Sequence, residues 1–192
     1  MKQLPECQLI LDKLRNELPK HLYYHTIDHT LDVYESVSTI AKLEGVNSPD
    51  IKLLQVAAIY HDAGYLIEKQ RHEELSCEMA KEYLPQFKYA LEDINSICSI
   101  IMATKMPQNP KTHLEEIICD ADLDYLGRSD FFIVSKRLYK EMIELGSITD
   151  WKEWIKLQEV FLKQHRYFTK SAIQLRQTEK EQNLKIILSK TN

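Results

Sequence analysis

The stretch Ala57-Ala58-Ile59-Tyr60-His61-Asp62-Ala63-Gly64 decides how this chain is interpreted. Apolar residues with helical periodicity lead up to it from Leu53, and an adjacent His-Asp pair ends the run. Asp62 therefore falls where the pattern predicts burial, and a buried carboxylate is costly unless a cation compensates its charge. Taken alone, a histidine in an apolar run is more often a core residue than a ligand. The pair gains weight from the segments around it.

The composition of the whole chain favours helices. Its 192 residues include only 4 Gly and 6 Pro, whereas all-β sandwiches and barrels need turn residues at intervals of about 8 to 12 positions. The chain is 44% hydrophobic and 28% charged. That is enough apolar surface for a packed core, and it excludes a disordered chain. The length fits one domain.

Helical periodicity runs through nine segments of the sequence. Ser48 with the proline after it marks one helix start, a capping box at 112–115 marks another, and Ser129 caps a third. Gly64 and Gly127 are expected to end the helices before them. The expected helices cover about residues 6–18, 27–43, 48–64, 71–84, 90–105, 112–127, 129–145, 150–162 and 170–188.

Charge, cysteine content and hydropathy limit the partners and the compartment. The net charge of −4 argues against binding to a nucleic-acid backbone. Four widely spaced cysteines without a CxxC motif are expected to be buried thiols in a reducing environment. The first residues lack the apolar run of a signal peptide, and no stretch approaches the roughly 18 apolar residues of a membrane span. We therefore expect a soluble cytoplasmic protein with no membrane association.

Two further segments carry residue types that bind metals. One contains His25 and His29, which are four residues apart and hence on one face of a helix. In the other, the acidic triplet Asp120, Asp122 and Asp124 interrupts an apolar face. Asp120 and Asp122 lie on nearly opposite sides of a helix, so one of them is expected to face inward. Imidazole nitrogens and carboxylate oxygens suit a catalytic divalent cation.

The order His, His-Asp, Asp on successive helices resembles the HD-domain superfamily of metal-dependent phosphohydrolases. The likeness covers roughly residues 23–127, and His61-Asp62 corresponds to the pair that names the superfamily. His29-Thr30-Leu31-Asp32-Val33 resembles its first-histidine helix, and Ala121-Asp122-Leu123 resembles its last-aspartate helix. An HD dipeptide alone is a weak signal. Three motifs in this order, two of them after apolar runs, are a specific one.

The resemblance implies an all-α helical bundle of the HD type. The whole chain, 1–192, is expected to form a single domain. Its core would cover about 20–128, with additional C-terminal helices of about 129–190 packed on it. The resemblance also implies one divalent metal ion as cofactor, and the sequence does not distinguish Mn, Mg, Fe, Co, Ni and Zn.

Carried over position by position, the resemblance implies His29, His61, Asp62 and Asp122 as metal ligands. Asp122 is favoured because Ala-Asp-Leu matches the last motif of the superfamily. Asp120 is a rival ligand, or instead supports a ligand by hydrogen bonding. Binuclear members place two more histidines between the HD pair and the last aspartate, where this chain offers only His72 and His113. Because His113 is expected at the surface, a mononuclear site is expected.

The catalytic residues implied by the resemblance are Asp62, His72, Glu73 and His25. His72 and Glu73 match the region where members carry an acid, a base or a second-metal ligand, although a glutamate at a helix start is also favoured by the helix dipole. His25 lies where cyclic-nucleotide phosphodiesterases carry a general acid. It is alternatively a substrate contact or a residue that orients His29.

Substrate contacts are expected from His25, Lys105 and Arg128. A cation at either of the last two positions suits a phosphate group. Lys105 has a second interpretation, because a lysine near a helix C-terminus also offsets the helix dipole. Lys69 and Arg71, near the HD pair, are further candidates of the same kind.

The first hypothesis for the function is a metal-dependent phosphohydrolase that hydrolyses a phosphate ester or anhydride. Its partner would be a small phosphate-containing molecule such as a nucleotide, and the loops at 65–70 and 106–111 are expected to form the rim of its pocket. Two alternatives stay open. One is a non-enzymatic nucleotide-binding sensor module, and the less favoured one is a di-iron oxygenase, which needs more histidines. The sequence is compatible with a homodimer.

Overall fold

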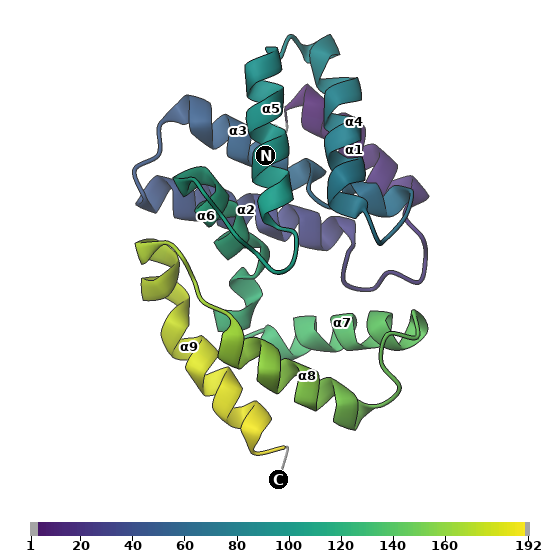
Figure 1. Cartoon of the computed structure of the whole chain (residues 1–192), viewed down its shortest axis with the longest axis vertical. Helices are drawn as coiled ribbons and strands as arrows, with labels where there is room; N and C mark the ends of the chain where they lie inside the picture. The colour runs from purple at the N-terminus through teal and green to yellow at the C-terminus, as the bar shows by residue number, and fades with distance from the viewer. Residues whose placement is uncertain (1–3, 191–192) are drawn as a thin grey trace.

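The computed structural model describes residues 4–190, and within that range every regular element is a helix, which confirms the predicted all-α fold. Residues 1–3, where no signal peptide is expected, and 191–192 lie outside it. No helix in the described range is both long and apolar enough to cross a bilayer. All four cysteines are buried free thiols, as predicted. The elements in Figure 1 are α1 (Pro5–Glu17), α2 (Ile27–Leu43), α3 (Ser48–Tyr60), η1 (Ala63–Leu66), α4 (His72–Tyr83), η2 (Leu84–Phe87), α5 (Leu91–Ala103), α6 (His113–Asp122), η3 (Asp124–Gly127), α7 (Phe131–Glu144), α8 (Trp151–Gln164) and α9 (Lys170–Leu188).

Helix α3 is the centre of the larger hydrophobic core. Residues 56–60 are each at most 1% exposed, and five consecutive buried residues mean that a helix is covered on every side. Helices α1, α2, α5 and α6 all contact it. Because α1 inserts Ile10 and Leu11 into the same cluster, this core includes residues before the expected boundary near 20.

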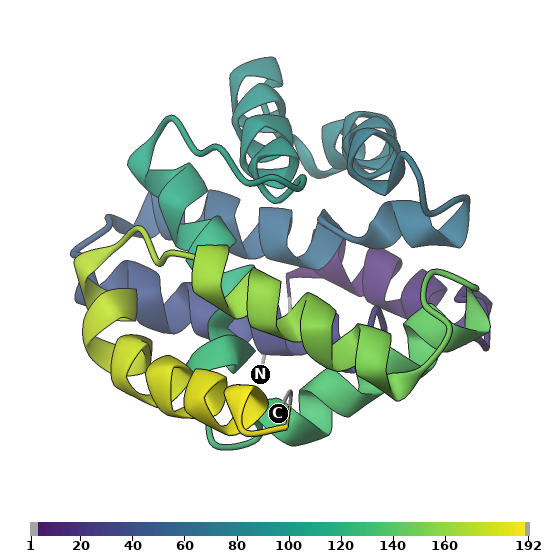
Figure 2. The same ribbon diagram turned by 60° about the horizontal axis from the view of Figure 1, so that its bottom comes forward.

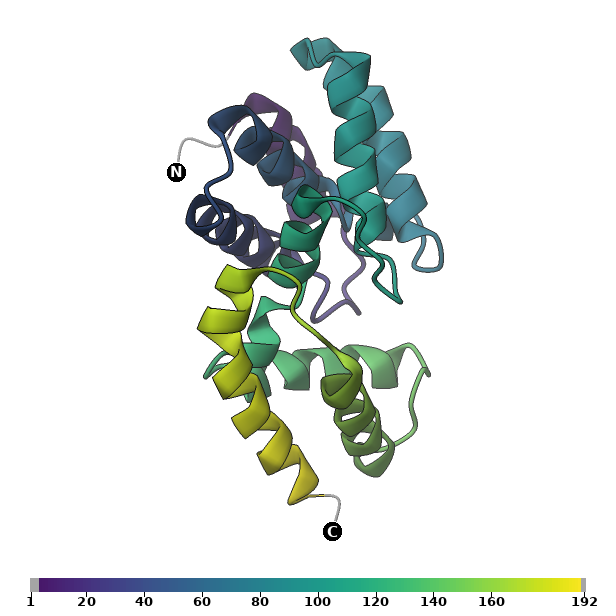
Figure 3. The ribbon, with the colours of Figure 1, turned by 60° about the vertical axis from the view of Figure 1, so that its left-hand side comes forward.

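Helices α7, α8 and α9 form a second layer beside this core. They share a separate hydrophobic cluster with η3, in which Phe131, Trp154 and Ile187 are at most 2% exposed. Figures 1 and 3 show the three helices together at one end of the molecule, and Figure 2 shows α8 and α9 side by side. They reach the core through η3, which contacts α7 and α9, and through α2, which contacts α9.

Two polar contacts fix α9 to the core. The carboxylate of Asp120 accepts hydrogen bonds from the backbone N–H groups of Phe168 and Thr169, each at 2.8 Å, just before α9 begins. The carboxylate of Asp124 accepts a hydrogen bond from Nε of Arg176, within α9, at 2.6 Å. Both aspartates are at most 2% exposed. Loss of Arg176 would leave the buried Asp124 with only the longer contacts from Ser36 at 3.4 Å and Arg128 at 3.5 Å, so it is expected to destabilise the protein.

Several helix starts can be compared with their predicted caps. Thr112 caps α6 as predicted, and its hydroxyl accepts a helix N–H. The cap of α3 is Asn47 rather than Ser48, because the amide oxygen of Asn47 accepts a helix N–H at 3.0 Å and Ser48 is already helical. Helix α7 begins after Asp130 rather than after Ser129.

Gly64 and Gly127 do not end α-helices, because α3 and α6 stop earlier and each glycine lies in a 3-10 turn. Their role is to allow close backbone contact. A Cβ atom added at Gly64 would lie 2.0 Å from the carbonyl oxygen of His72, and one added at Gly127 would lie 2.4 Å from that of Arg176. Glycine alone permits such an approach.

We predict that Gly127→Ala loosens α9. The added methyl group meets the backbone of Arg176, so α9 must shift, at a cost of about 1–3 kcal/mol in the free energy of unfolding. The check is hydrogen exchange, which should rise in α9 more than in α3. Gly45→Ala is the control: its Cβ meets no atom within 4 Å, but φ is +71°, so it lowers global stability without a selective effect on α9. Unchanged protection of α9 in the Gly127 variant would contradict the prediction.

Candidate metal centre

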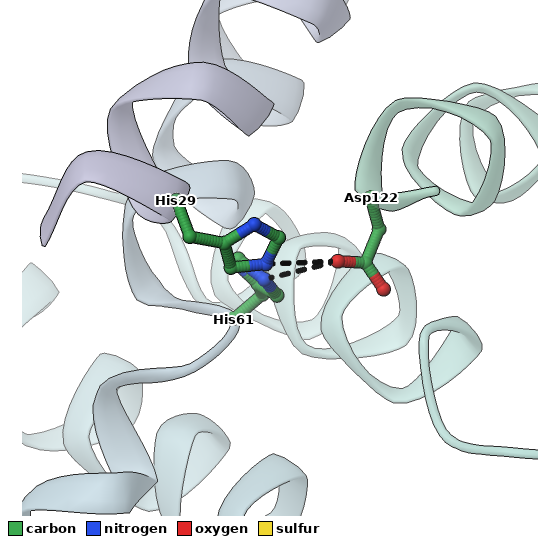
Figure 4. Close-up of side chains that lie close together, drawn as sticks. All are labelled: His29, His61 and Asp122. Atoms are coloured by element: carbon green, nitrogen blue, oxygen red, sulfur yellow. Dashed lines mark ion pairs between the residues drawn. The ribbon is translucent and has the colours of Figure 1, made fainter. Parts of the chain in front are cut away.

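Three side chains from three helices point toward one another (Figure 4). His29 lies in α2, His61 directly follows α3, and Asp122 is the last residue of α6. Their ligand atoms all lie within 4.8 Å of one another. Oδ1 of Asp122 is 3.1 Å from Nε2 of His29 and 3.5 Å from Nε2 of His61. Helices that are far apart in the sequence therefore bring these motifs to one point.

Asp62 joins this group from the position next to His61. Its Oδ2 lies 3.5 Å from Nε2 of His29 and 3.3 Å from Nε2 of His61. Neighbouring side chains on an α-helix point about 100° apart. Because α3 ends at Tyr60 and the chain continues into η1, both members of the HD pair reach the same point. All four predicted ligands are thus brought together.

Three of the ligand atoms are buried without a hydrogen bond to any described residue: Nε2 of His29, Nε2 of His61 and Oδ2 of Asp62. Each unsatisfied buried polar atom costs roughly 1–3 kcal/mol, so three at one point mark the place of a missing partner. Two imidazoles and two carboxylates fit a divalent cation. In its neutral form His61 is oriented for this role, because its Nδ1 donates to the carbonyl oxygen of Ala58 at 2.8 Å and leaves the lone pair on Nε2.

The charges at this point favour cation binding. Burial disfavours the charged form of Asp62 and Asp122, yet the neighbouring imidazoles lower the pKa of both carboxyl groups below its usual value. Burial also opposes protonation of His61, but the two carboxylates outweigh it and raise the pKa of His61 well above its usual value. Both aspartates therefore stay ionised at neutral pH and supply the negative charge that holds a cation.

A cavity of about 500 Å³ opens onto Asp62 and Asp122, which is the volume of a small-molecule site. Tyr65, Lys69 and Met106 are in its lining, so both loops that the sequence predicts at the rim contribute to it. The remaining lining residues form two groups. The first comes from the segment before α2, the start of α4 and the residues next to α5, α6 and η3: Tyr24, His25, His72, Glu73, Thr104, Leu123 and Tyr125. The second comes from α7 and α8: Leu138, Glu141, Met142, Leu157, Gln158 and Phe161.

His72 and Glu73 begin α4 beside Asp62. Nε2 of His72 lies 3.5 Å from Oδ1 of Asp62 and 3.4 Å from Oε1 of Glu73. Nδ1 of His72 is bonded to the carbonyl oxygen of Lys69 at 2.8 Å. A carbonyl oxygen only accepts, so neutral His72 carries its proton on Nδ1 and its lone pair on Nε2. Both residues therefore lie in the cavity, where the sequence predicts them.

His25 reaches the cavity because Glu141 of α7 holds it. Nδ1 of His25 makes a short hydrogen bond to Oε1 of Glu141. The other oxygen, Oε2, accepts the backbone N–H groups of residues 23–25 at 2.9, 2.8 and 3.1 Å. Nε2 of His25 faces the hydroxyl of Tyr65 at 3.2 Å. Burial lowers the pKa of His25, but the hydrogen bond to Glu141 and the nearby carboxylates produce a net rise.

Three of the predicted residues lie away from the cavity. Asp120 is occupied by the backbone before α9, so it does not face the other ligands. Lys105 forms a surface ion pair with Glu74. Arg128 is bonded to Asp32 at 2.7 Å and to a second carboxylate at 3.0 Å. The expected roles of Asp120, Lys105 and Arg128 at the site are not supported by these positions.

Sequence reasoning missed the part of the cavity that α7 and α8 supply. Glu141 belongs to a helix with several exposed charges, and no local pattern separates it from a surface glutamate. Leu157 and Phe161 have the spacing of core residues within the expected helix at 150–162. In the structure Leu157 is 40% exposed and lines the cavity, so helical spacing alone did not distinguish a core residue from a cavity residue.

Comparison with known proteins agrees with this geometry. Residues 26–124, about half of the chain, match the family model of the HD domain. The crystal structure of a predicted HD superfamily hydrolase from an uncultured Thermotogales bacterium matches 100% of this chain and 97% of its own, with a TM-score of 0.64 and 20% sequence identity, which shows a shared fold. No curated protein matches the chain significantly. The family match contains all four ligand candidates, and the chain belongs to the HD domain family of metal-dependent hydrolases.

Proposed function

We propose that this protein is a phosphohydrolase that cleaves a phosphate ester or anhydride of a small molecule, a nucleotide or a related compound. The observation that carries the proposal is the convergence of four candidate ligand side chains beside a cavity of small-molecule size, with Nε2 of His29, Nε2 of His61 and Oδ2 of Asp62 buried without a hydrogen bond to any described residue. A divalent cation held by His29, His61, Asp62 and Asp122 would supply Lewis acidity, which stabilises charge on a phosphoryl oxygen and makes water acidic enough to ionise near neutral pH.

His72 and Glu73 are placed to receive the proton of the attacking water. Nε2 of His72 carries the free lone pair and lies within 3.5 Å of both Glu73 and Asp62. A proton taken up at Nε2 would therefore be stabilised by two carboxylates. General-base help of this kind contributes typically 10²- to 10⁴-fold to a rate.

His25 is placed to act as the general acid toward the leaving group. Its Nδ1 is held by Glu141 and its pKa is raised, so Nε2 keeps a second proton to a higher pH than a free imidazole does. Burial raises the pKa of Tyr65, which keeps its hydroxyl protonated beside that nitrogen. Lys69, rather than the predicted Lys105 or Arg128, is the cation in the cavity lining that would meet a phosphoryl oxygen.

The di-iron alternative finds little support in this cavity. Besides the proposed ligands, the histidines in the described lining are His25 and His72. Glu141 occupies Nδ1 of His25, which leaves His72 as the free imidazole. Oxygenase chemistry at two irons needs more nitrogen ligands than this arrangement offers.

The proposal is tested by phosphate release. Purified protein supplemented with Mn²⁺ or Mg²⁺ should release phosphate from members of a panel of nucleotides, sugar phosphates and aryl phosphates. Asp62→Ala should abolish the release, because it removes a ligand, and should leave the helical circular dichroism signal intact. An Asp62→Ala protein with full activity, or wild-type protein that binds metal yet releases no phosphate from any compound, would overturn the proposal.

Asp120 and Asp122 form a matched pair for the metal site. We predict that Asp122→Asn loses bound metal in elemental analysis and loses the rise in melting temperature on adding Mn²⁺. Asp120→Asn should keep both responses and instead lower the free energy of unfolding by about 1–3 kcal/mol, because an amide group then faces backbone N–H donors. The reverse outcome would make Asp120 the ligand.

Glu141→Gln should change how the activity depends on pH. The charged carboxylate raises the pKa of His25, so its loss lets protonated His25 disappear at a lower pH. The alkaline limb of the kcat profile should then move to lower pH. Glu144→Gln, at an exposed position of the same helix, is the control and should leave the profile in place. An identical profile in all three proteins would exclude His25 as the general acid.

A further inference from the structure

The cavity is lined by ionisable side chains on one side and by mainly apolar side chains on the other, and this difference indicates the kind of substrate. One part carries the candidate ligands Asp62 and Asp122 together with His25, His72 and Glu73. The other part comes from α7 and α8, which lie outside the 26–124 family match. Apart from Glu141, which holds His25, and Gln158, its side chains are apolar: Leu138, Met142, Leu157 and Phe161. We infer that the substrate is a phosphate monoester of an uncharged, apolar alcohol. This inference rests on the proposed phosphohydrolase function and names the substrate class of that site.

The charges in the cavity limit the substrate to one phosphate group. Lys69 is the one lysine or arginine among the lining residues that the structure describes. The other cations expected to bind substrate, Lys105 and Arg128, are engaged in ion pairs elsewhere. A phosphate monoester carries about two negative charges, which one divalent cation with Lys69 can balance. Each further phosphate would bring another negative charge into the cavity, where the remaining cationic group of the described lining, protonated His25, is already paired with Glu141.

The apolar surface of the α7–α8 wall is only partly covered within the described part of the chain, because Leu138, Met142 and Phe161 pack against the second hydrophobic cluster but remain partly exposed. Leu157 is 40% exposed although it lies beside the buried Gln158, and its free surface borders the cavity. The one amide in this wall, Gln158, has its Oε1 bonded to the hydroxyl of Ser135 at 3.1 Å. Apolar surface next to a reactive centre gains free energy when a ligand covers it. An apolar alcohol attached to the phosphoryl group would cover it in the same binding event.

The test compares three probes: 1-naphthyl phosphate, glycerol 3-phosphate and ATP. Wild-type protein loaded with Mn²⁺ should show the highest kcat/KM on 1-naphthyl phosphate, at least tenfold above glycerol 3-phosphate, with ATP the poorest substrate. Leu157→Ser should lower kcat/KM for 1-naphthyl phosphate by about tenfold, through KM, and leave glycerol 3-phosphate unchanged. Val160→Ser, at a 46% exposed position of the same helix outside the cavity lining, should change neither value.

The outcomes separate this inference from the proposed function. A protein that releases phosphate from none of the probes or the wider panel counts against the phosphohydrolase itself. A protein that is active but prefers ATP or glycerol 3-phosphate keeps the function and overturns the substrate class. An equal loss on all probes in Leu157→Ser, with unfolding curves like the wild type, would also overturn it, because the wall would then not contact the alcohol.

Discussion

Ionised carboxylates inside a protein need compensating charge, and this requirement is concentrated at Asp62 and Asp122. Both stay ionised because imidazoles surround them, yet Oδ2 of Asp62 and both Nε2 atoms remain without hydrogen bonds among the described residues. Burying these atoms without hydrogen bonds is unfavourable, so packing of the surrounding helices must keep the four side chains together. The buried α3 helix and the close contact at Gly64 supply that packing. The metal-binding geometry is therefore a product of the core and not of a flexible loop.

Most of the fold could be predicted because the buried face of a helix appears as apolar periodicity in its own sequence. The apolar period along α3 predicted its burial, and Thr112 predicted the start of α6. The ends of α3 and α6 could not be predicted in the same way. Gly64 and Gly127 have the appearance of helix ends, but their lack of a side chain allows close contact with another helix, with α4 at His72 for Gly64 and with α9 at Arg176 for Gly127. A contact of that kind leaves no trace in the neighbouring sequence.

The same distinction applies to the site. His29, His61, Asp62 and Asp122 could be predicted because each falls in a motif with a fixed local pattern. Asp120 was a rival for a good reason, since a buried aspartate needs a partner; its partner is the backbone at 168–169. Glu141 could not be found, because its role depends on a segment more than one hundred residues earlier. Arg128 has the right charge for a phosphate, but neighbouring carboxylates already neutralise it.

The carboxylate of Glu141 joins two segments that lie on either side of the family match in the sequence, residues 23–25 before it and α7 after it. It binds the backbone at residues 23–25 through three N–H groups and His25 through its ring. A change in the sequence of α7 would have to keep this carboxylate to preserve the position of His25. The apolar side chains of α7 and α8 beside it do not carry that constraint. If the proposed function holds, the metal site would belong to the helices that the family match covers, and the choice of compound would belong to α7 and α8, which lie outside it.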